Sequence, residues 1–185
     1  MLHLHEKRNK AMKRLCSFIT LLVGVLTLSF AQDDDAKYAT ELLKPSTEAP
    51  NFTFNDNGKA TSLKDLRGSY VVLDFWATWC GDCRKDMPAM KSIYADFSQK
   101  GIRFVGISFD KNREALDKYI SENNIAWPQY FDGKSMRESP MSESYKIKWI
   151  PTVYILDKEG RVVLATVMID KVRAKLNEIC NKIGR

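Results

Sequence analysis

The sequence predicts an α/β fold: a central mixed β-sheet flanked by helices, with an N-terminal β-hairpin extension. Short apolar, β-branched runs alternate with segments whose apolar residues recur at helical spacing, which is the pattern of an α/β domain. The last part of the chain shows a second hairpin pattern and then a helix, which adds antiparallel strands to the sheet. The length of 185 residues suits a single domain with a tail.

The first predicted elements are a hairpin, a short helix and a buried strand. Asn57-Gly58 tolerates the positive φ of a tight turn, which predicts a hairpin over residues 51–62. A brief helix is predicted at 63–67. Residues 70–76 form a nearly continuous apolar run, which is typical of a central strand buried on both faces.

The rest of the chain continues the alternation. A helix is expected over 81–99, and Pro88 within it should cause a kink. Residues 127–147 are less regular, with one short helix expected near 139–145. The remaining predictions are a strand at 102–109, a helix from Asn112, a strand at 152–156, its hairpin partner at 161–166 and a last helix capped by Asp170.

The beginning of the chain predicts a secretory signal peptide. Lys13 and Arg14 precede an uncharged run of 14 residues at 15–28, and Ser29-Phe30-Ala31 supplies small residues at the two positions that a cleavage site needs. The alternative is an uncleaved membrane anchor, but residues 15–31 number only 17, whereas a spanning helix needs ~20 apolar residues. We therefore expect an extracytoplasmic, periplasmic protein that meets the membrane only if this segment stays attached.

This prediction divides the chain into three parts. Residues 1–31 are the signal peptide, and Met12 is an alternative start of translation because it stands directly before the basic pair. Residues 32–47 are polar and are expected to be a flexible lead-in. Residues 48–185 are expected to form the folded domain.

Charge and composition exclude several functional classes. The chain has 29 basic and 23 acidic residues; residues 1–31 hold five and one of these, which leaves 24 and 22, or a net charge of +2. Since no basic cluster interleaved with aromatics remains, we expect no nucleic-acid partner. Both histidines, His3 and His5, also lie in the removed part, which excludes histidine-based catalysis and histidine-ligated metal sites. We expect no cofactor and no metal.

Cys80-Gly81-Asp82-Cys83 is the sharpest chemical signal in the chain. It stands where the buried strand meets the next helix, which places Cys80 at the helix N-terminus and Cys83 one turn inside. The unpaired N–H groups and partial positive charge of that helix end favour a thiolate. Because the thiolate is the form that attacks a disulfide, we predict Cys80 as the nucleophile and Cys83 as the resolving thiol of a redox pair.

Other uses of these cysteines have less support. A zinc site needs two more ligands, and the mature chain offers only Cys180. A purely structural disulfide suits an exported protein, but so short a loop constrains the unfolded chain little. Cys180 itself is either a small buried hydrophobe or a surface thiol that forms an intermolecular disulfide.

Two segments resemble the thioredoxin superfamily. Residues 71–83, with the sequence VVLDFWATWCGDC, are similar to its active-site segment, and Pro88 matches its helix-kinking proline. Residues 145–160 are similar to its second signature, in which Ile150-Pro151 would be a cis peptide bond facing the disulfide.

The resemblance extends over residues 48–185 and implies a thioredoxin fold. The early hairpin and the insert through 127–132 are most similar to the TlpA/ResA-type branch of AhpC/TSA-type redoxins. Members of that branch are thiol–disulfide oxidoreductases outside the cytoplasm. For substrate binding, the resemblance implies that the Ile150 backbone beside Pro151 pairs with an extended substrate strand, and that Trp79 shields the disulfide and meets the partner.

Asp74 is a candidate acid–base residue. It lies within the apolar strand before the cysteines, so its pKa should be raised, and it could accept the Cys83 proton through water. The alternative is a strand-end carboxyl with satisfied hydrogen bonds. Two departures from thioredoxin bear on this site: Asp82 replaces the usual proline, and Gly106-Ile107 stand where thioredoxin carries a lysine.

The sequence therefore predicts an exported thiol–disulfide oxidoreductase that works in the reducing direction. Its expected partners are protein disulfide or dithiol substrates and an upstream membrane thiol donor. One alternative is a peroxiredoxin-type thiol peroxidase, although such an enzyme needs a threonine where this chain has Ala77, with Thr78 one step away. A copper or metal carrier of the same fold is a further alternative that lacks a histidine ligand.

Overall fold

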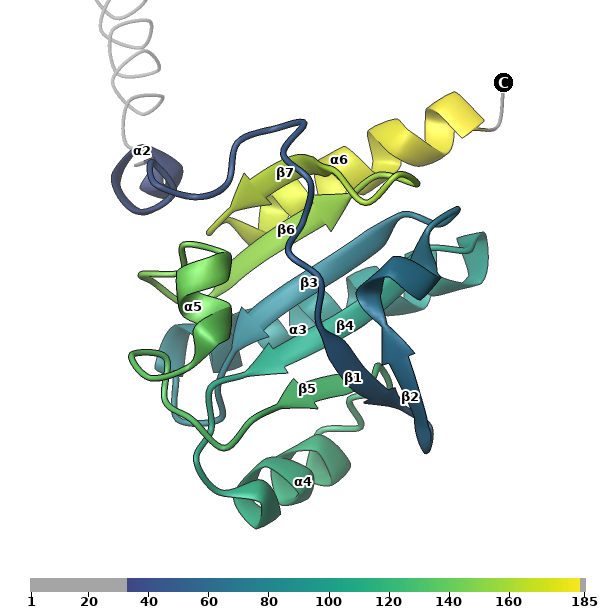
Figure 1. Cartoon of the computed structure of the whole chain (residues 1–185). Coiled ribbons are helices and arrows are strands. Elements are labelled where there is room, and N and C mark those ends of the chain that lie inside the picture. Colours follow the sequence, from purple (N-terminus) through teal and green to yellow (C-terminus); the bar gives the residue numbers. More distant parts are fainter. Residues whose placement is uncertain (1–32, 184–185) are drawn as a thin grey trace, which may run out of the picture. The chain divides into compact units, whose positions relative to one another are not determined.

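The computed structural model describes residues 33–183, and its centre is a five-stranded mixed sheet (Figure 1). The strand order is β5-β4-β3-β6-β7. The strands are β3 (Val71–Trp76), β4 (Arg103–Ser108), β5 (Gln129–Phe131), β6 (Thr152–Leu156) and β7 (Val162–Thr166).

Strand β3 lies in the middle of this sheet, as its apolar sequence predicts. All six of its residues are buried, and it pairs in parallel with β4 and antiparallel with β6. In this register Phe75 lies opposite Thr152, so the end of β3 adjoins the beginning of β6. The two segments that resemble thioredoxin signatures therefore meet at one end of the strands, where β3 ends and β6 begins.

Helices α3 (Gly81–Phe97) and α6 (Ile169–Ile183) contact each other and cover one face of the sheet (Figure 1). Pro88 lies inside α3, as expected. A 3₁₀ turn, η2 (Ser98–Lys100), directly follows α3. Two further helices are α4 (Arg113–Glu122), capped by the Asn112 side chain, and the short α5 (Pro140–Ser144).

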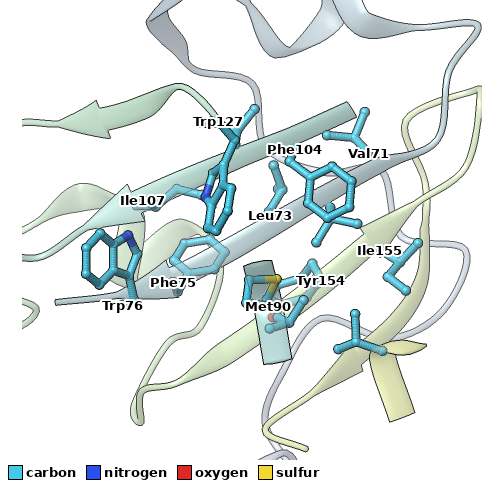
Figure 2. Close-up of a cluster of buried hydrophobic side chains, with 14 of the residues drawn as sticks. Val71, Leu73, Phe75, Trp76, Met90, Phe104, Ile107, Trp127, Tyr154 and Ile155 are labelled. Carbon is cyan, nitrogen blue, oxygen red and sulfur yellow. The ribbon is translucent and has the colours of Figure 1, made fainter. Parts of the chain in front are cut away.

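The hydrophobic core joins the central strands to α3. Figure 2 shows Leu73 and Phe75 of β3 near Tyr154 of β6, on one face of the sheet. Met90 of α3 packs on the opposite face, where it lines a cavity with Trp76 of β3. These side chains are at most 3% exposed, and burying one large apolar side chain contributes roughly 1.5–3 kcal/mol. The core therefore fixes β3 and α3, the two elements that flank the cysteine pair.

The predicted hairpin is confirmed as β1 (Thr53–Asp56) and β2 (Lys59–Ser62), and β1 packs beside β5. Its turn needs the left-handed region, with φ of 53° at Asn57 and 88° at Gly58. The brief helix after it is η1 (Leu63–Leu66), a 3₁₀ helix rather than an α-helix.

The short strand β5 lies in the segment that the sequence marks only as less regular. Its three residues pair in parallel with β4, with Gln129 opposite Gly106. A strand of this length shows no alternation that a sequence pattern could reveal.

The expected flexible lead-in instead packs against the domain. Residues Asp34–Tyr38 form helix α2. The carboxylate of Asp35 accepts hydrogen bonds from Thr166 Oγ1 and the Val167 N–H, both at 2.8 Å. Leu42 is buried, and the Leu43 N–H donates to the Tyr154 hydroxyl. The polar composition of this segment does not predict these hydrogen bonds, because each joins residues more than a hundred positions apart.

The predicted signal peptide, residues 1–31, lies outside the described residues. Within residues 33–183, no helix combines the length and the apolar character that crossing a bilayer requires.

Candidate active site

Cys80 and Cys83 form a disulfide at the N-terminus of α3, with their Cα atoms 5.3 Å apart. Cys80 is the N-cap residue, and its Sγ accepts a hydrogen bond of 3.1 Å from the Cys83 N–H. Both residues are buried, Cys80 at 7% and Cys83 at 3% exposure. Cys80 is the more exposed of the two residues.

The position of Cys80 follows from the local backbone. Strand β3 ends at Trp76, the Cys80 N–H donates to the Ala77 carbonyl at 3.2 Å, and the helix begins at Gly81. The sulfur thus occupies the place of the side-chain oxygen in an ordinary N-cap. In the reduced state the same N–H and the helix dipole would stabilise a thiolate there.

The Ile150-Pro151 peptide bond is cis, as expected. Ile150 is buried, and its carbonyl oxygen lies 3.7 Å from Cys80 Sγ. This contact is possible because β6 begins directly after the proline and is the antiparallel neighbour of β3. The structure therefore brings Ile150 and Pro151 to the cysteine pair across 70 residues of chain.

Asp74 lies on β3, six residues before Cys80, and is 5% exposed. Burial raises the pKa of its carboxyl to about 7, and the charge of Asp86 adds to this rise. Asp74 lines a cavity of ≈ 10 Å³ together with Cys83, Asp86 and Pro151. A cavity of this size holds about one water molecule, which is the arrangement that proton transfer through water needs.

Asp86 is a candidate that the sequence interpretation missed. It follows Cys83 by three residues on α3, so both lie on one helix face and line the cavity with Asp74. Its pKa is raised by partial burial and by the charges of Asp82 and Asp170. The spacing of the CxxC cysteine and an acid one turn later is the signal that could have identified it.

Two exposed tryptophans adjoin the two segments of the site: Trp79 directly precedes Cys80, and Trp149 directly precedes Ile150-Pro151. Trp79 is 57% exposed, and its Nε1–H donates to the Phe109 carbonyl at 3.4 Å. Trp149, which precedes the cis-proline dipeptide, is 45% exposed and stacks on Tyr38 with ring centroids 4.6 Å apart. Trp149 was not among the predicted site residues, and its exposure was not apparent from the sequence.

Gly106 explains how the site differs from thioredoxin beside Asp74. It pairs opposite Asp74 in the β3–β4 register. A Cβ at this position would lie 2.0 Å from Gln129 Oε1, so the glutamine side chain fills the space that a lysine would need. Gln129 Oε1 also accepts a hydrogen bond of 3.0 Å from Trp76 Nε1. Trp76 itself lines the cavity beside Asp74.

Cys180 is a free cysteine on α6 and is partly exposed. It packs against the edge of the hydrophobic core rather than within it. It does not line the cavity that Asp74 and Cys83 share.

Comparison with known sequences shows the family to which this chain belongs. The family model described as AhpC/TSA matches residues 45–165. The thiol-disulfide oxidoreductase ResA of Oceanobacillus iheyensis is 30% identical, over 94% of this chain and 95% of its own length. The ResA of Bacillus subtilis is 29% identical, over 77% of this chain and 78% of its own length.

Solved structures extend this likeness to the fold. The thioredoxin domain of a thiol-disulfide oxidoreductase from Bacteroides vulgatus superposes with a TM-score of 0.67 at 31% identity, covering 75% of this chain and 99% of that chain. A thiol:disulfide interchange protein DsbE from Chlorobium tepidum gives a TM-score of 0.65 at 28% identity, with 75% and 98% covered. The chain therefore belongs to the AhpC/TSA family, as a TlpA/ResA-like thiol–disulfide oxidoreductase with a thioredoxin fold.

Proposed function

We propose that this protein reduces disulfides of extracytoplasmic proteins, with Cys80 as the attacking thiolate and Cys83 as the resolving thiol. One observation carries the proposal: Cys80 caps α3, and its Sγ lies 3.7 Å from the Ile150 carbonyl oxygen. The helix end stabilises the anion, and the neighbouring loop offers backbone for an extended substrate.

The reaction begins with the reduced enzyme. The Cys80 thiolate attacks one sulfur of the substrate disulfide and forms a mixed disulfide with it, while the substrate S–S bond breaks and the other substrate sulfur leaves as a thiolate. Cys83 then loses its proton and attacks Cys80 Sγ, which releases the second substrate thiolate. Two electrons pass to the substrate, and the enzyme is left with the Cys80–Cys83 disulfide that the structure contains.

Asp74 is the proposed base for the second step. It shares the cavity with Cys83, and a carboxyl with a pKa of about 7 is well matched to proton transfer at neutral pH. The proton leaves Cys83 through the one water that the cavity can hold and reaches Asp74, with Asp86 on the same cavity wall. A released substrate thiolate takes up the second proton from solvent.

Substrate binding is proposed at the exposed edge of the disulfide. An extended substrate segment would pair with the backbone at Ile150 beside Pro151, and Trp79 would cover the segment next to Cys80. The 57% exposure of Trp79 leaves its indole face open to such a partner.

Export and electron supply complete the proposal. Residues 1–31 have the features of a cleaved signal peptide, which would place the protein in the periplasm, and the relatives named ResA support an extracytoplasmic role. There the oxidised enzyme needs an upstream membrane thiol donor to return to its reduced form.

The peroxidase alternative has less support from the geometry. Ala77 stands where a peroxiredoxin needs its threonine, and the hydroxyl of Thr78 donates to the buried carboxylate of Asp110 at 2.6 Å. That hydroxyl is already engaged and does not face a peroxide site.

Trapping of partners tests the proposed function. A Cys83→Ser variant, expressed with its leader in the native cell envelope, should accumulate mixed disulfides with protein partners because the resolving thiol is missing. A matched Cys80→Ser variant should accumulate none. If the Cys83→Ser variant forms no adduct and still reduces disulfides at the wild-type rate, the two-cysteine mechanism is wrong.

A further inference from the structure

The turn that joins β3 to α3 is hydrogen-bonded to Phe109 and Asp110, the two residues that follow β4. The Phe109 N–H donates to the Trp76 carbonyl at 3.0 Å, which continues the β3–β4 pairing past both strands. The Phe109 carbonyl in turn accepts the Trp79 indole N–H. The backbone of residue 109 thus touches both ends of the turn that leads to Cys80.

Asp110 makes the strongest of these attachments. Its carboxylate accepts the Thr78 N–H at 3.0 Å and the Thr78 hydroxyl at 2.6 Å, across 32 residues of chain. It also accepts the Ser108 hydroxyl at 2.8 Å, and its own N–H donates to Ser108 Oγ. Asp110 is only 3% exposed, and a carboxylate so deeply buried is stable there because these donors replace water.

We propose that Asp110 is a positioning residue for thiol–disulfide exchange: by holding Thr78, it fixes Trp79 and Cys80 in one arrangement that matches a peptide-borne disulfide. This inference rests on the proposed function and deepens it. Asp110 touches neither sulfur in any contact described for residues 33–183; its effect passes through the turn.

The physical reason lies in the geometry of the attack. The thiolate must approach one sulfur of the substrate in line with its S–S bond, while the flanking substrate backbone is held by Trp79 and the cis-proline loop. A turn with only two backbone attachments could tilt, and a misplacement of about 1 Å can cost up to ~10²-fold in rate. A small disulfide without flanking backbone can adjust its own approach, so its rate should not depend on the turn.

The test compares two probes that give the same signal. One is free 5,5′-dithiobis(2-nitrobenzoate), and the other is an extended peptide whose single cysteine is linked to 2-nitro-5-thiobenzoate. Attack by Cys80 on either probe breaks its S–S bond and releases the coloured thiolate, so both second-order rates are read at one wavelength. The quantity of interest is the peptide rate divided by the free-probe rate, measured with fully reduced protein.

Thr78→Val removes the hydroxyl donor to Asp110 at nearly constant volume. We expect it to lower the peptide-to-free ratio by roughly tenfold, with the free-probe rate changed by less than about twofold. Thr78→Ser keeps the hydroxyl and should restore the ratio, and Asp110→Asn should lower it at least as much as Thr78→Val. Ser108→Ala removes another donor to the Asp110 carboxylate but leaves both hydrogen bonds from Thr78 in place. It should therefore lower the melting temperature and leave the ratio unchanged.

Three outcomes would overturn the proposal. The first is an unchanged ratio in a folded Thr78→Val, because Asp110 would then only stabilise the fold. The second is an equal loss with both probes, because the effect would then lie in the reactivity of Cys80 itself. The third, release of no thiolate from either probe by wild-type protein, would reject the proposed function as well, and only this outcome does so.

Discussion

Asp74 and Cys83 line the same small cavity from two different elements, the middle of β3 and the first turn of α3. The buried carboxyl has a pKa raised to about 7, and its space is just enough for one water. In the proposed mechanism, the N-terminus of α3 stabilises the Cys80 thiolate, and Asp74 accepts the Cys83 proton through this cavity.

Asp74→Asn should slow the resolving step more than the first attack. An amide cannot accept the Cys83 proton, and a general base contributes typically 10²–10⁴-fold, so we expect resolution of a mixed disulfide to slow by at least roughly 10²-fold. Rapid-quench analysis would show accumulation of the Cys80 adduct. An unchanged resolution rate in this variant would remove Asp74 from the mechanism.

Asp86→Asn should move the pH dependence of the resolving step downward. The charge of Asp86 contributes to the raised pKa of Asp74, so its removal lets Asp74 ionise at lower pH. The midpoint of the resolution rate against pH measures this shift. Lys91→Gln changes a half-buried residue on the same helix that does not line the cavity; it serves as the control and should leave the midpoint in place.

The same carboxyl predicts how stability depends on pH. The pKa of Asp74 is raised from 3.8 to about 7 on folding, so between these values the folded state binds more protons than the unfolded state. Stability should therefore fall as pH rises through this window. Asp74→Asn removes the cost of the buried charge, which is at most about 4 kcal/mol above pH 7.

Urea unfolding at pH 4 and pH 8 checks this expectation. The loss of stability between the two pH values should be smaller in Asp74→Asn than in the wild type. A loss equal in both proteins would mean that Asp74 does not titrate in this window.

Gly106→Ala should destabilise the fold through Gln129. The new Cβ would lie 2.0 Å from Gln129 Oε1, and overpacking of this kind costs about 1–3 kcal/mol. In a double-mutant cycle, Gln129→Ala should relieve most of the added cost, because it empties the space. Additive losses in the double variant would show that the clash is not with Gln129.

Asp35→Asn should loosen the segment before the hairpin. Its carboxylate accepts from Thr166 and Val167 and pairs with Lys171 at 2.7 Å, so the change should cost about 1–3 kcal/mol. It should also make residues 34–43 more sensitive to limited proteolysis. Asp34→Asn changes an exposed carboxyl in the same helix and should have little effect. Equal cleavage rates in the two variants would contradict the packing of this segment.

Local patterns predict much of the site. The apolar run of β3, the cysteine spacing and the Ile150-Pro151 signature each lie within a few residues, and each maps to the expected place in the structure. The buried environment of Asp74 follows from the same run, because a carboxyl among six buried strand residues is shielded from bulk solvent.

What the sequence does not reveal depends on contacts between distant segments. Asp110 reaches Thr78 across 32 residues, and the lead-in reaches β7 across 131. Neither contact produces a periodic pattern or a motif in the sequence from which it could be predicted. Trp149 stacks on Tyr38, and the two rings come together only in the folded chain.

The central claim is that Cys80 is a thiolate stabilised by the start of α3 while Cys83 stays protonated and buried. Its most direct test is the alkylation rate of each cysteine in the reduced protein across a pH series, read by peptide mass spectrometry with limiting iodoacetamide. Our account predicts that Cys80 is labelled first, with a midpoint below the ordinary cysteine pKa of about 8.5, and that Cys83 is protected. Labelling of Cys83 first, or of both with a midpoint near that ordinary value, would contradict it.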